Sequence, residues 1–226
     1  MVIATTTNTK IRVLLVDDHP AIQEALANAL RNKLDIEVCG QASSSEEAFR
    51  IVQKERPDVA VIDISLGDAH GLDLVQNLRT QFPSMQVVVF SMYDENVYAE
   101  RAIRAGASAY VMKSEPTQNI IDAIRSVHQG EVHLSQKMFS RILGKVGLKR
   151  SSAPGFAIDE LTDREMAVFQ MLGEGYSIEE ITDQLNLSRK TVETYRRRAK
   201  EKLGLDSVGE LLQYAVKWVH GQGQKR

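Results

Sequence analysis

Short apolar runs alternate with amphipathic segments along the first half of the chain. The runs are rich in β-branched residues and lie at residues 11–16, 36–42, 59–63, 86–91 and 109–112. They are apolar at consecutive positions, which is typical of strands covered on both faces of a parallel sheet. Helical patterns follow them at residues 20–33, 44–55, 71–81, 95–105 and 117–129. This alternation predicts an α/β domain with a doubly wound, five-stranded parallel sheet.

The stretch from residue 131 to residue 157 breaks this alternation. A short amphipathic segment near residues 135–146 runs into "GLKRSSAPGF", in which Gly, Ser, Pro and basic residues cluster. Such a composition is typical of a linker between domains. We therefore expect a first domain over residues 10–130, a linker with a short helix over residues 131–157, and a second domain over residues 158–221.

The second domain has helical patterns that begin at recognisable cap residues. Capping boxes of the form S/T-x-x-E occur at Thr162, Ser177 and Ser207, and Ser188 is a further N-cap candidate. They predict helices near residues 163–173, 178–185, 189–203 and 208–219. Residues 186–188 link the second and third of these tightly, and the third is rich in arginine. We therefore predict a small all-α, four-helix domain that contains a helix-turn-helix.

The charge of the chain is unevenly distributed. The net charge of the 226 residues is −2, but residues 1–130 carry 12 basic and 17 acidic side chains, while residues 189–202 carry seven basic and two acidic ones. This local cluster, rather than the average, favours a nucleic acid as a partner. A solvated charged face is the alternative interpretation.

Three features of the sequence predict a cytoplasmic protein with no membrane partner. No apolar run approaches the ~20 residues that span a bilayer. The start, "MVIATTTNTK", lacks the long apolar core of a secretory signal. Cys39 is the single cysteine, so no intrachain disulfide can form, as expected for a reducing compartment.

Polar residues follow the ends of several predicted strands. Asp17 and Asp18 follow the first, Asp63 ends the third, Ser91 ends the fourth, and Lys113 follows the fifth. In a sheet of order 2-1-3-4-5, the first, third and fourth strands are neighbours, so these side chains would converge in one crevice. Each alone has a simpler interpretation, since an Asp at a strand end often caps a helix or turn.

Three clustered carboxylates repel one another unless a cation lies among them. Mg²⁺ prefers carboxylate and carbonyl oxygens and commonly bridges protein to phosphate. One carboxylate could then attack a phosphoryl group and become an acyl phosphate. Asp63 is the best placed nucleophile, with Asp17, Asp18 and the backbone carbonyl of Ser65 as metal ligands.

Four segments carry a resemblance to a known domain: "LLVDDHP", "DVAVIDISL", "VVVFS" and "AGASAYVMK". They resemble the flavodoxin-like receiver domain of two-component response regulators. The resemblance implies that Asp63 accepts a phosphoryl group from a sensor histidine kinase and that Asp17 and Asp18 serve Mg²⁺. It also implies that Ser91 and Lys113 contact the phosphoryl oxygens, and that rotation of the aromatic residue Tyr110 accompanies activation. The chain departs from the family pattern at Leu66-Gly67, where Met-Pro is common, and at Ser114, where proline often follows the lysine.

The segment from residue 189 to residue 203 has the dimensions and charge of a DNA-reading helix. Val192, Ala199 and Leu203 can face a core while basic residues point outward. A helix of ~10–12 Å diameter fits the major groove, which is ~12 Å wide. The second domain resembles the LuxR-type DNA-binding domain, and with the receiver the match is to the NarL/FixJ subfamily. The implied DNA contacts are Ser188, Lys190, Thr191, Glu193, Thr194, Arg196, Arg197 and Lys200, with Glu193, Thr194 and Arg197 as base readers.

These features together predict a DNA-binding transcriptional regulator that is controlled by phosphorylation. We expect a homodimer on a double-stranded DNA operator, and no enzymatic activity beyond accepting and slowly losing its own phosphoryl group. Two alternatives stay open at this point. The first is a Mg²⁺-dependent phosphotransferase that uses the same aspartyl chemistry, and the second is a receiver that only mediates protein contacts.

Overall fold

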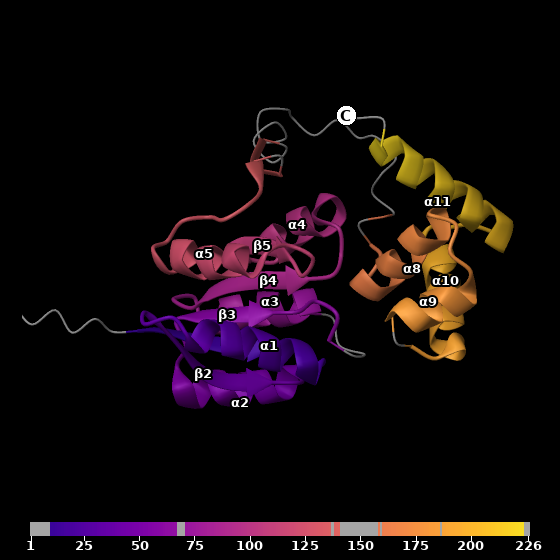
Figure 1. Ribbon diagram of the computed structural model, residues 1–226. Helices are drawn as coiled ribbons and strands as arrows, with labels where there is room; N and C mark the ends of the chain where they lie inside the picture. The colour runs from indigo at the N-terminus through magenta and orange to yellow at the C-terminus, as the bar shows by residue number, and fades with distance from the viewer. Residues whose placement is uncertain are drawn as a thin grey trace, which may run out of the picture. The chain divides into compact units, whose positions relative to one another are not determined.

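A computed structural model describes residues 10–66, 71–136, 138–140, 158, 160–185 and 187–223. The chain forms two compact units, residues 1–149 and residues 150–226 (Figure 1). Among the helices in these described ranges, none combines the length and the apolar character that crossing a membrane requires.

The first unit is an α/β domain whose strands and helices alternate as predicted. In chain order its elements are β1 (Ile11–Val16), α1 (Pro20–Arg31), β2 (Ile36–Ala42), α2 (Ser45–Glu55), β3 (Val59–Ile62), α3 (Gly71–Gln81), β4 (Gln86–Ser91), α4 (Glu95–Arg104), β5 (Ala109–Met112) and α5 (Thr117–His128). The five strands are all parallel and lie in the order β2-β1-β3-β4-β5. The predicted fold class is confirmed.

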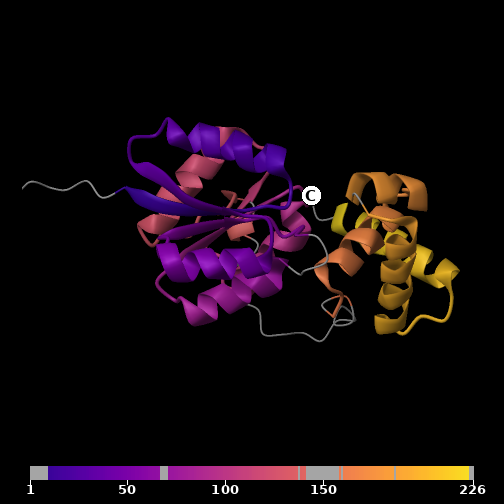
Figure 2. The same cartoon turned by 90° about the horizontal axis from the view of Figure 1, so that it is seen from below.

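Helices cover both faces of this sheet. On one face α1 and α5 pack against alternate strand residues, and Leu30, Ile124 and Val13 belong to this core. Figure 2 shows the indigo helix α1 and the purple helix α2 on opposite sides of the strands. All four residues of β3 are buried, because β3 is a central strand with neighbours on both sides. The edge strand β2 has exposed positions at Glu37 and Gln41, where a neighbouring strand is missing on one side.

The second unit is helical. Its elements are α8 (Asp163–Gly173), α9 (Ile178–Leu185), α10 (Arg189–Lys202) and α11 (Val208–Gly223). The predicted fold of this domain is confirmed, although α11 extends beyond the predicted end at residue 219. The predicted link of residues 186–188 between α9 and α10 is described only in part, because residue 186 lies outside the described residues.

The cap residues that predicted these helices mostly behave as expected. Thr162 and Glu165 form a complete capping box at the start of α8, and Ser177 and Glu180 exchange the same pair of bonds before α9. The Ser188 hydroxyl accepts from the Thr191 N–H. At α11 the expected box is half wrong. Ser207 Oγ accepts from the Glu210 N–H, but the Glu210 carboxylate accepts from Asp206 and not from Ser207.

Most of the predicted linker lies outside the described residues. Residues 136 and 138–140 are helical, which covers part of the short helix expected near residues 135–146. Ser135 lies just before this helical segment, and its hydroxyl donates to Glu95 Oε1 at 2.9 Å, at the start of α4. The predicted domain boundaries at residues 130 and 158 stay predictions.

Gly173 permits the close packing of α8 against α11. A Cβ atom at this position would lie 2.5 Å from the carbonyl oxygen of Ala215 and 2.8 Å from Val219 Cγ2. Gly173→Ala should therefore destabilise the second unit by about 1–3 kcal/mol, as overpacking does. Urea denaturation of the full chain, followed by the fluorescence of its single tryptophan, Trp218 on α11, would measure this.

Gly209→Ala is the matched control for this substitution. Gly209 also lies in α11, but the nearest atom to a Cβ there is Ser207 Oγ at 3.8 Å. Gly209 is exposed in the first turn of α11, so alanine there should change stability by no more than about 0.5 kcal/mol. Equal effects of the two substitutions on the denaturation midpoint would contradict the packing argument.

Candidate functional site

The register of the sheet brings the polar strand ends together. Val16 pairs with Ile62, so Asp17 and Asp63 follow residues that already lie side by side. The Asp63 N–H donates to the Val16 carbonyl at 2.8 Å. On the other side of β4, the Lys113 N–H donates to the Ser91 carbonyl at 2.7 Å. The residues that the sequence singled out therefore lie at the carboxyl edge of one sheet.

Lys113 joins two of the carboxylates. Its Nζ lies 2.6 Å from Asp17 Oδ2 and 2.6 Å from Asp63 Oδ2, and only 4% of its side chain is exposed. Burial by itself lowers the pKa of Lys113, but the Asp63 and Asp17 carboxylates outweigh burial, so the pKa lies above its ordinary value. Burial raises the pKa of Asp63 and the Asp17 charge adds to this, while Lys113 acts in the opposite direction. The ammonium thus keeps two buried acids close together.

The acidic residues can hold a hard cation. Asp17, Asp18, His19 and Asp63 each offer a ligand atom, and these atoms lie within 4.8 Å of one another. Asp17 and Asp63 are buried, whereas Asp18 is partly exposed, so the cluster is reachable from solvent. Mg²⁺ is bound by oxygen ligands and usually keeps several water molecules. Three carboxylates would supply such oxygen atoms, and the solvent-facing side of the cluster leaves room for the waters. The Ser65 N–H donates to Asp63 Oδ1 at 3.0 Å, which places the Ser65 backbone beside the same acid.

His19 lies against the acids rather than capping the helix that follows. It occupies the N-cap position of α1, but its side chain makes no cap bond there. Its Nδ1 lies 2.8 Å from Asp18 Oδ1 and 3.2 Å from Asp17 Oδ1. His19 is therefore the N-cap residue of α1 by its backbone position only.

Ser91 and Tyr110 are connected through the backbone of Tyr93. Ser91 is fully buried, and its hydroxyl accepts from the Tyr93 N–H at 3.2 Å. The Tyr110 hydroxyl donates to the Tyr93 carbonyl at 2.8 Å. Burial raises the pKa of Tyr110 well above its ordinary value, although a hydrogen bond to Ser91 acts in the opposite direction. The Tyr93 ring in turn stacks on buried Tyr98 of α4, with 4.6 Å between ring centroids.

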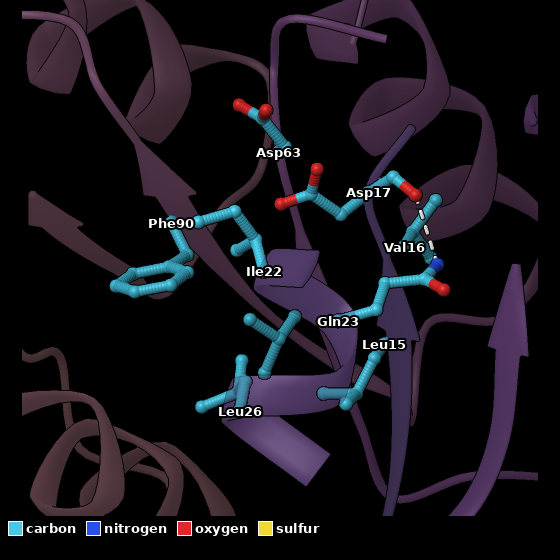
Figure 3. A pocket seen from close by; sticks show the side chains of 9 residues that line it. Leu15, Val16, Asp17, Ile22, Gln23, Leu26, Asp63 and Phe90 are labelled. Carbon is cyan, nitrogen blue, oxygen red and sulfur yellow. Dashed lines mark hydrogen bonds between the residues drawn. The ribbon is translucent and has the colours of Figure 1, made fainter. Parts of the chain in front are cut away.

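A small cavity lies beside Asp17 and Asp63 (Figure 3). Apolar side chains line most of it: Leu15, Val16, Ile22, Leu26, Val61 and Phe90. Gln23 also lines the cavity, and its side-chain amide donates to the Asp17 carbonyl.

The basic helix α10 has one buried and one exposed side. Val192 and Ala199 are buried as predicted, together with Tyr195. On the exposed side, Arg189 pairs with Glu179 of α9 at 2.6 Å and with Glu193 at 3.2 Å.

Some of the predicted DNA-contacting side chains already make hydrogen bonds or ion pairs within the protein, and others do not. The Ser188 hydroxyl caps the helix, Thr194 Oγ donates to the Lys190 carbonyl, and Lys200 Nζ donates to the Asp206 carbonyl. Arg197 pairs with Glu201 at 2.8 Å. Within the part of the chain that the structure describes, Lys190 and Arg196 have no ion-pair partner, so their charges are the most available to a polyanion.

Two family models match the chain, one in each unit. The response regulator receiver domain matches residues 13–125, and the bacterial regulatory proteins of the luxR family match residues 159–215. The chain belongs to the response regulator family. Its luxR-type second domain makes this response regulator a transcriptional regulator and not a classical enzyme.

Two relatives match this response regulator over 92% of its length. The transcriptional regulatory protein MctR of Rhizobium johnstonii is 32% identical over 207 residues, which cover 92% of this chain and 94% of MctR. The oxygen regulatory protein NreC of Staphylococcus epidermidis is 29% identical over 214 residues, 92% of this chain and 97% of NreC.

Solved structures of response regulators resemble it as well. RcsB of Salmonella enterica serovar Typhimurium, bound to promoter P1flhDC in the presence of the phosphomimetic BeF3−, has a TM-score of 0.57 and 25% identity, with 92% of this chain and 98% of that chain covered. A LuxR-family response regulator from Aurantimonas has a TM-score of 0.56 and 27% identity, with 61% of this chain and 99% of that chain covered.

Sequence reasoning missed four parts of this response regulator's sites. Gln23 and Tyr93 carry no local signal, because Gln23 donates to the backbone carbonyl of Asp17, while Tyr93 contributes its backbone carbonyl to the hydroxyl of Tyr110. The ion pair between Glu165 and Lys202 joins residues 37 positions apart. Arg189 could have been found, since Glu193 lies four residues away on the same helix, a spacing that favours ion pairs.

Proposed function

We propose that Asp63 accepts a phosphoryl group from a sensor histidine kinase. Its carboxylate stands at the tip of a central strand, with Asp17 and Lys113 beside it. A carboxylate oxygen would form a P–O bond to the phosphorus atom while the P–N bond to the kinase histidine breaks. The electron pair of that bond returns to the imidazole, which then takes a proton from solvent.

We further propose that Asp17, Asp18, Asp63 and the Ser65 carbonyl hold Mg²⁺. When bound there, the ion would supply positive charge to the phosphoryl oxygens. Lys113 can move its ammonium from the two carboxylates to a phosphoryl oxygen, and the Ser91 hydroxyl can donate to another. The Ser91 hydroxyl accepts from the Tyr93 N–H, and the Tyr93 carbonyl accepts from Tyr110. A shift of the Ser91 hydroxyl toward a phosphoryl oxygen would therefore alter the hydrogen bonds of Tyr93.

The second unit is proposed to bind double-stranded operator DNA through α10. Base contacts would come from Glu193, Thr194 and Arg197, and phosphate contacts mainly from Lys190, Arg196 and Lys200. The remaining predicted contacts are Ser188 and Thr191. Phosphorylation would shift a two-state equilibrium toward the form that binds DNA as a homodimer. We place this activity in the cytoplasm, and we propose that the protein slowly loses its phosphoryl group to water.

One observation carries the proposal more than any other. A buried ammonium lies 2.6 Å from each of two carboxylates that follow paired positions of neighbouring strands. An ordinary structural ion pair needs one acid, whereas a site that receives a dianionic phosphoryl group needs a movable cation and a metal-binding acid cluster.

A mobility-shift assay tests the proposal. DNA selected from a randomised library should bind the protein about 5- to 150-fold more tightly after treatment with acetyl phosphate, the usual range for such coupling.

A Lys190→Ala, Arg196→Ala double variant should weaken binding to all sequences. It should also reduce the slope of log affinity against log salt concentration by about 2. Lys217→Ala, an exposed change on α11, is the control. Equal affinity with and without the phosphodonor would contradict control by phosphorylation.

A further inference from the structure

The peptide group between Asp17 and Asp18 is held by a side chain from the next helix. Gln23 lies in the first turns of α1, and its Nε2 donates to the Asp17 carbonyl at 2.8 Å (Figure 3). The same Nε2 donates to the carbonyl of Ala42 at the end of β2. Both hydrogens of the amide are therefore used, one for each carbonyl.

These bonds leave little freedom to the backbone of Asp17. Its N–H donates to the Ala42 carbonyl at 3.0 Å, and its own carbonyl accepts from Gln23. A peptide unit is planar, so fixing this carbonyl also fixes the N–H and Cα of Asp18 on the other side of the bond. The directions in which the Asp17 and Asp18 side chains leave the backbone are thus set together.

No capping side chain performs this task at the start of α1. The N-cap residue is His19, and its imidazole is turned toward the two acids instead of toward the helix. Gln23 is then the side chain that ties the first turns of α1 to the loop that bears the acids. Together with Asp17, it lines the small cavity that Leu26 and Phe90 also line.

We propose that Gln23 is a positioning residue for the metal site. By holding the Asp17–Asp18 peptide, its amide keeps both carboxylates where they bind Mg²⁺, although it does not touch the ion. Groups that orient metal ligands commonly contribute tenfold or more to metal affinity. This inference rests on the proposed function, because it assumes that the acids hold Mg²⁺.

Two variants of Gln23 distinguish the effect of its hydrogen bonds on the metal site from the effect of its side-chain volume on packing. Gln23→Met keeps the length and volume of the side chain but removes both N–H donors. Gln23→Glu keeps the shape but directs an acceptor at two carbonyl oxygens. Glu24→Gln is the matched control, since Glu24 is the next residue of α1 and is exposed.

Mg²⁺ binding to the full, unphosphorylated chain is measured by isothermal titration calorimetry. We expect the Kd of Gln23→Met and Gln23→Glu to rise about tenfold, and that of Glu24→Gln to equal the wild-type value. In a second measurement, the rate of phosphorylation by acetyl phosphate is followed against Mg²⁺ concentration. The Gln23 variants should need more Mg²⁺ for half-maximal rate and should return to near the wild-type rate at saturation.

The outcomes distinguish this inference from the proposed function. Wild-type protein that binds no Mg²⁺ would overturn the metal site and the role of Gln23 with it. Wild-type binding with an unchanged Kd in the variants, even at a lowered melting temperature, would overturn the role of Gln23 alone. If Gln23→Met does not fold, Gln23→Glu decides the question by the same two measurements.

Discussion

Asp63→Asn should carry no phosphoryl group after incubation with acetyl phosphate, whereas wild-type protein should give a retarded band in Phos-tag electrophoresis. The amide of asparagine keeps the shape of the side chain but has no nucleophilic carboxylate oxygen. Asp17 and Lys113 remain, so the site keeps its ion pair and the variant should stay folded. We expect complete loss of the retarded band.

The DNA-binding consequence follows from the same substitution. Asp63→Asn should bind operator DNA with the same affinity before and after acetyl phosphate treatment, at the level of the untreated wild type. Asp73→Asn removes an exposed carboxylate on α3 and should leave both the retarded band and the gain in affinity intact. A retarded band that persists in Asp63→Asn would show that another residue is the acceptor.

Glu165→Gln should destabilise the second unit by about 1.5–3 kcal/mol, the range for hydrogen bonds to charged groups. Glu165 is buried at the start of α8, and its Oε2 lies 2.7 Å from Lys202 Nζ at the end of α10. The same oxygen accepts from the Thr162 N–H at 2.9 Å. Glutamine keeps an acceptor for Thr162 but leaves the Lys202 ammonium without its counter-charge. Urea denaturation followed by Trp218 fluorescence measures the difference.

The destabilisation should depend on pH. Burial alone would raise the pKa of Glu165, but Lys202 and the Thr162 N–H outweigh burial, so the pKa lies below its ordinary value of 4.5. A lowered folded-state pKa contributes stability that is present above the unfolded-state value and is lost as the pH falls through the folded-state value. The difference between wild type and Glu165→Gln should therefore be full near neutral pH and shrink below about 4.5.

Glu180→Gln is the control for the capping contribution. Glu180 accepts from the Ser177 N–H at 2.8 Å in an equivalent capping box, but it is exposed. Its replacement should change stability by only a few tenths of a kcal/mol, as is usual for surface substitutions. If the two variants were equally unstable, the cap rather than the ion pair would explain the effect.

Because Lys202 ends α10, the ion pair also helps to hold the basic helix against α8.

The fold and the principal site residues could be predicted because their signals are local. A β-branched run such as residues 59–62 predicts a buried strand by itself, and a capping residue such as Thr162 predicts a helix start within three positions. Strand order followed from the general topology of such sheets, and it brought Asp17 and Asp63 to one edge. The error at Ser207 arose because Asp206 competes for the same carboxylate, and sequence spacing alone does not decide between adjacent N–H groups.

The sequence by itself determined the two domains' fold classes, the acids at the strand ends and the basic helix. Only the tertiary structure decided which groups hold them in place: Gln23 on the Asp17 carbonyl, Tyr93 between Ser91 and Tyr110, and Lys202 on Glu165. The physical reason is the range of each interaction. Periodicity and capping act within a few residues, whereas these hydrogen bonds and ion pairs depend on distances of about 3 Å that are set by how separate elements pack.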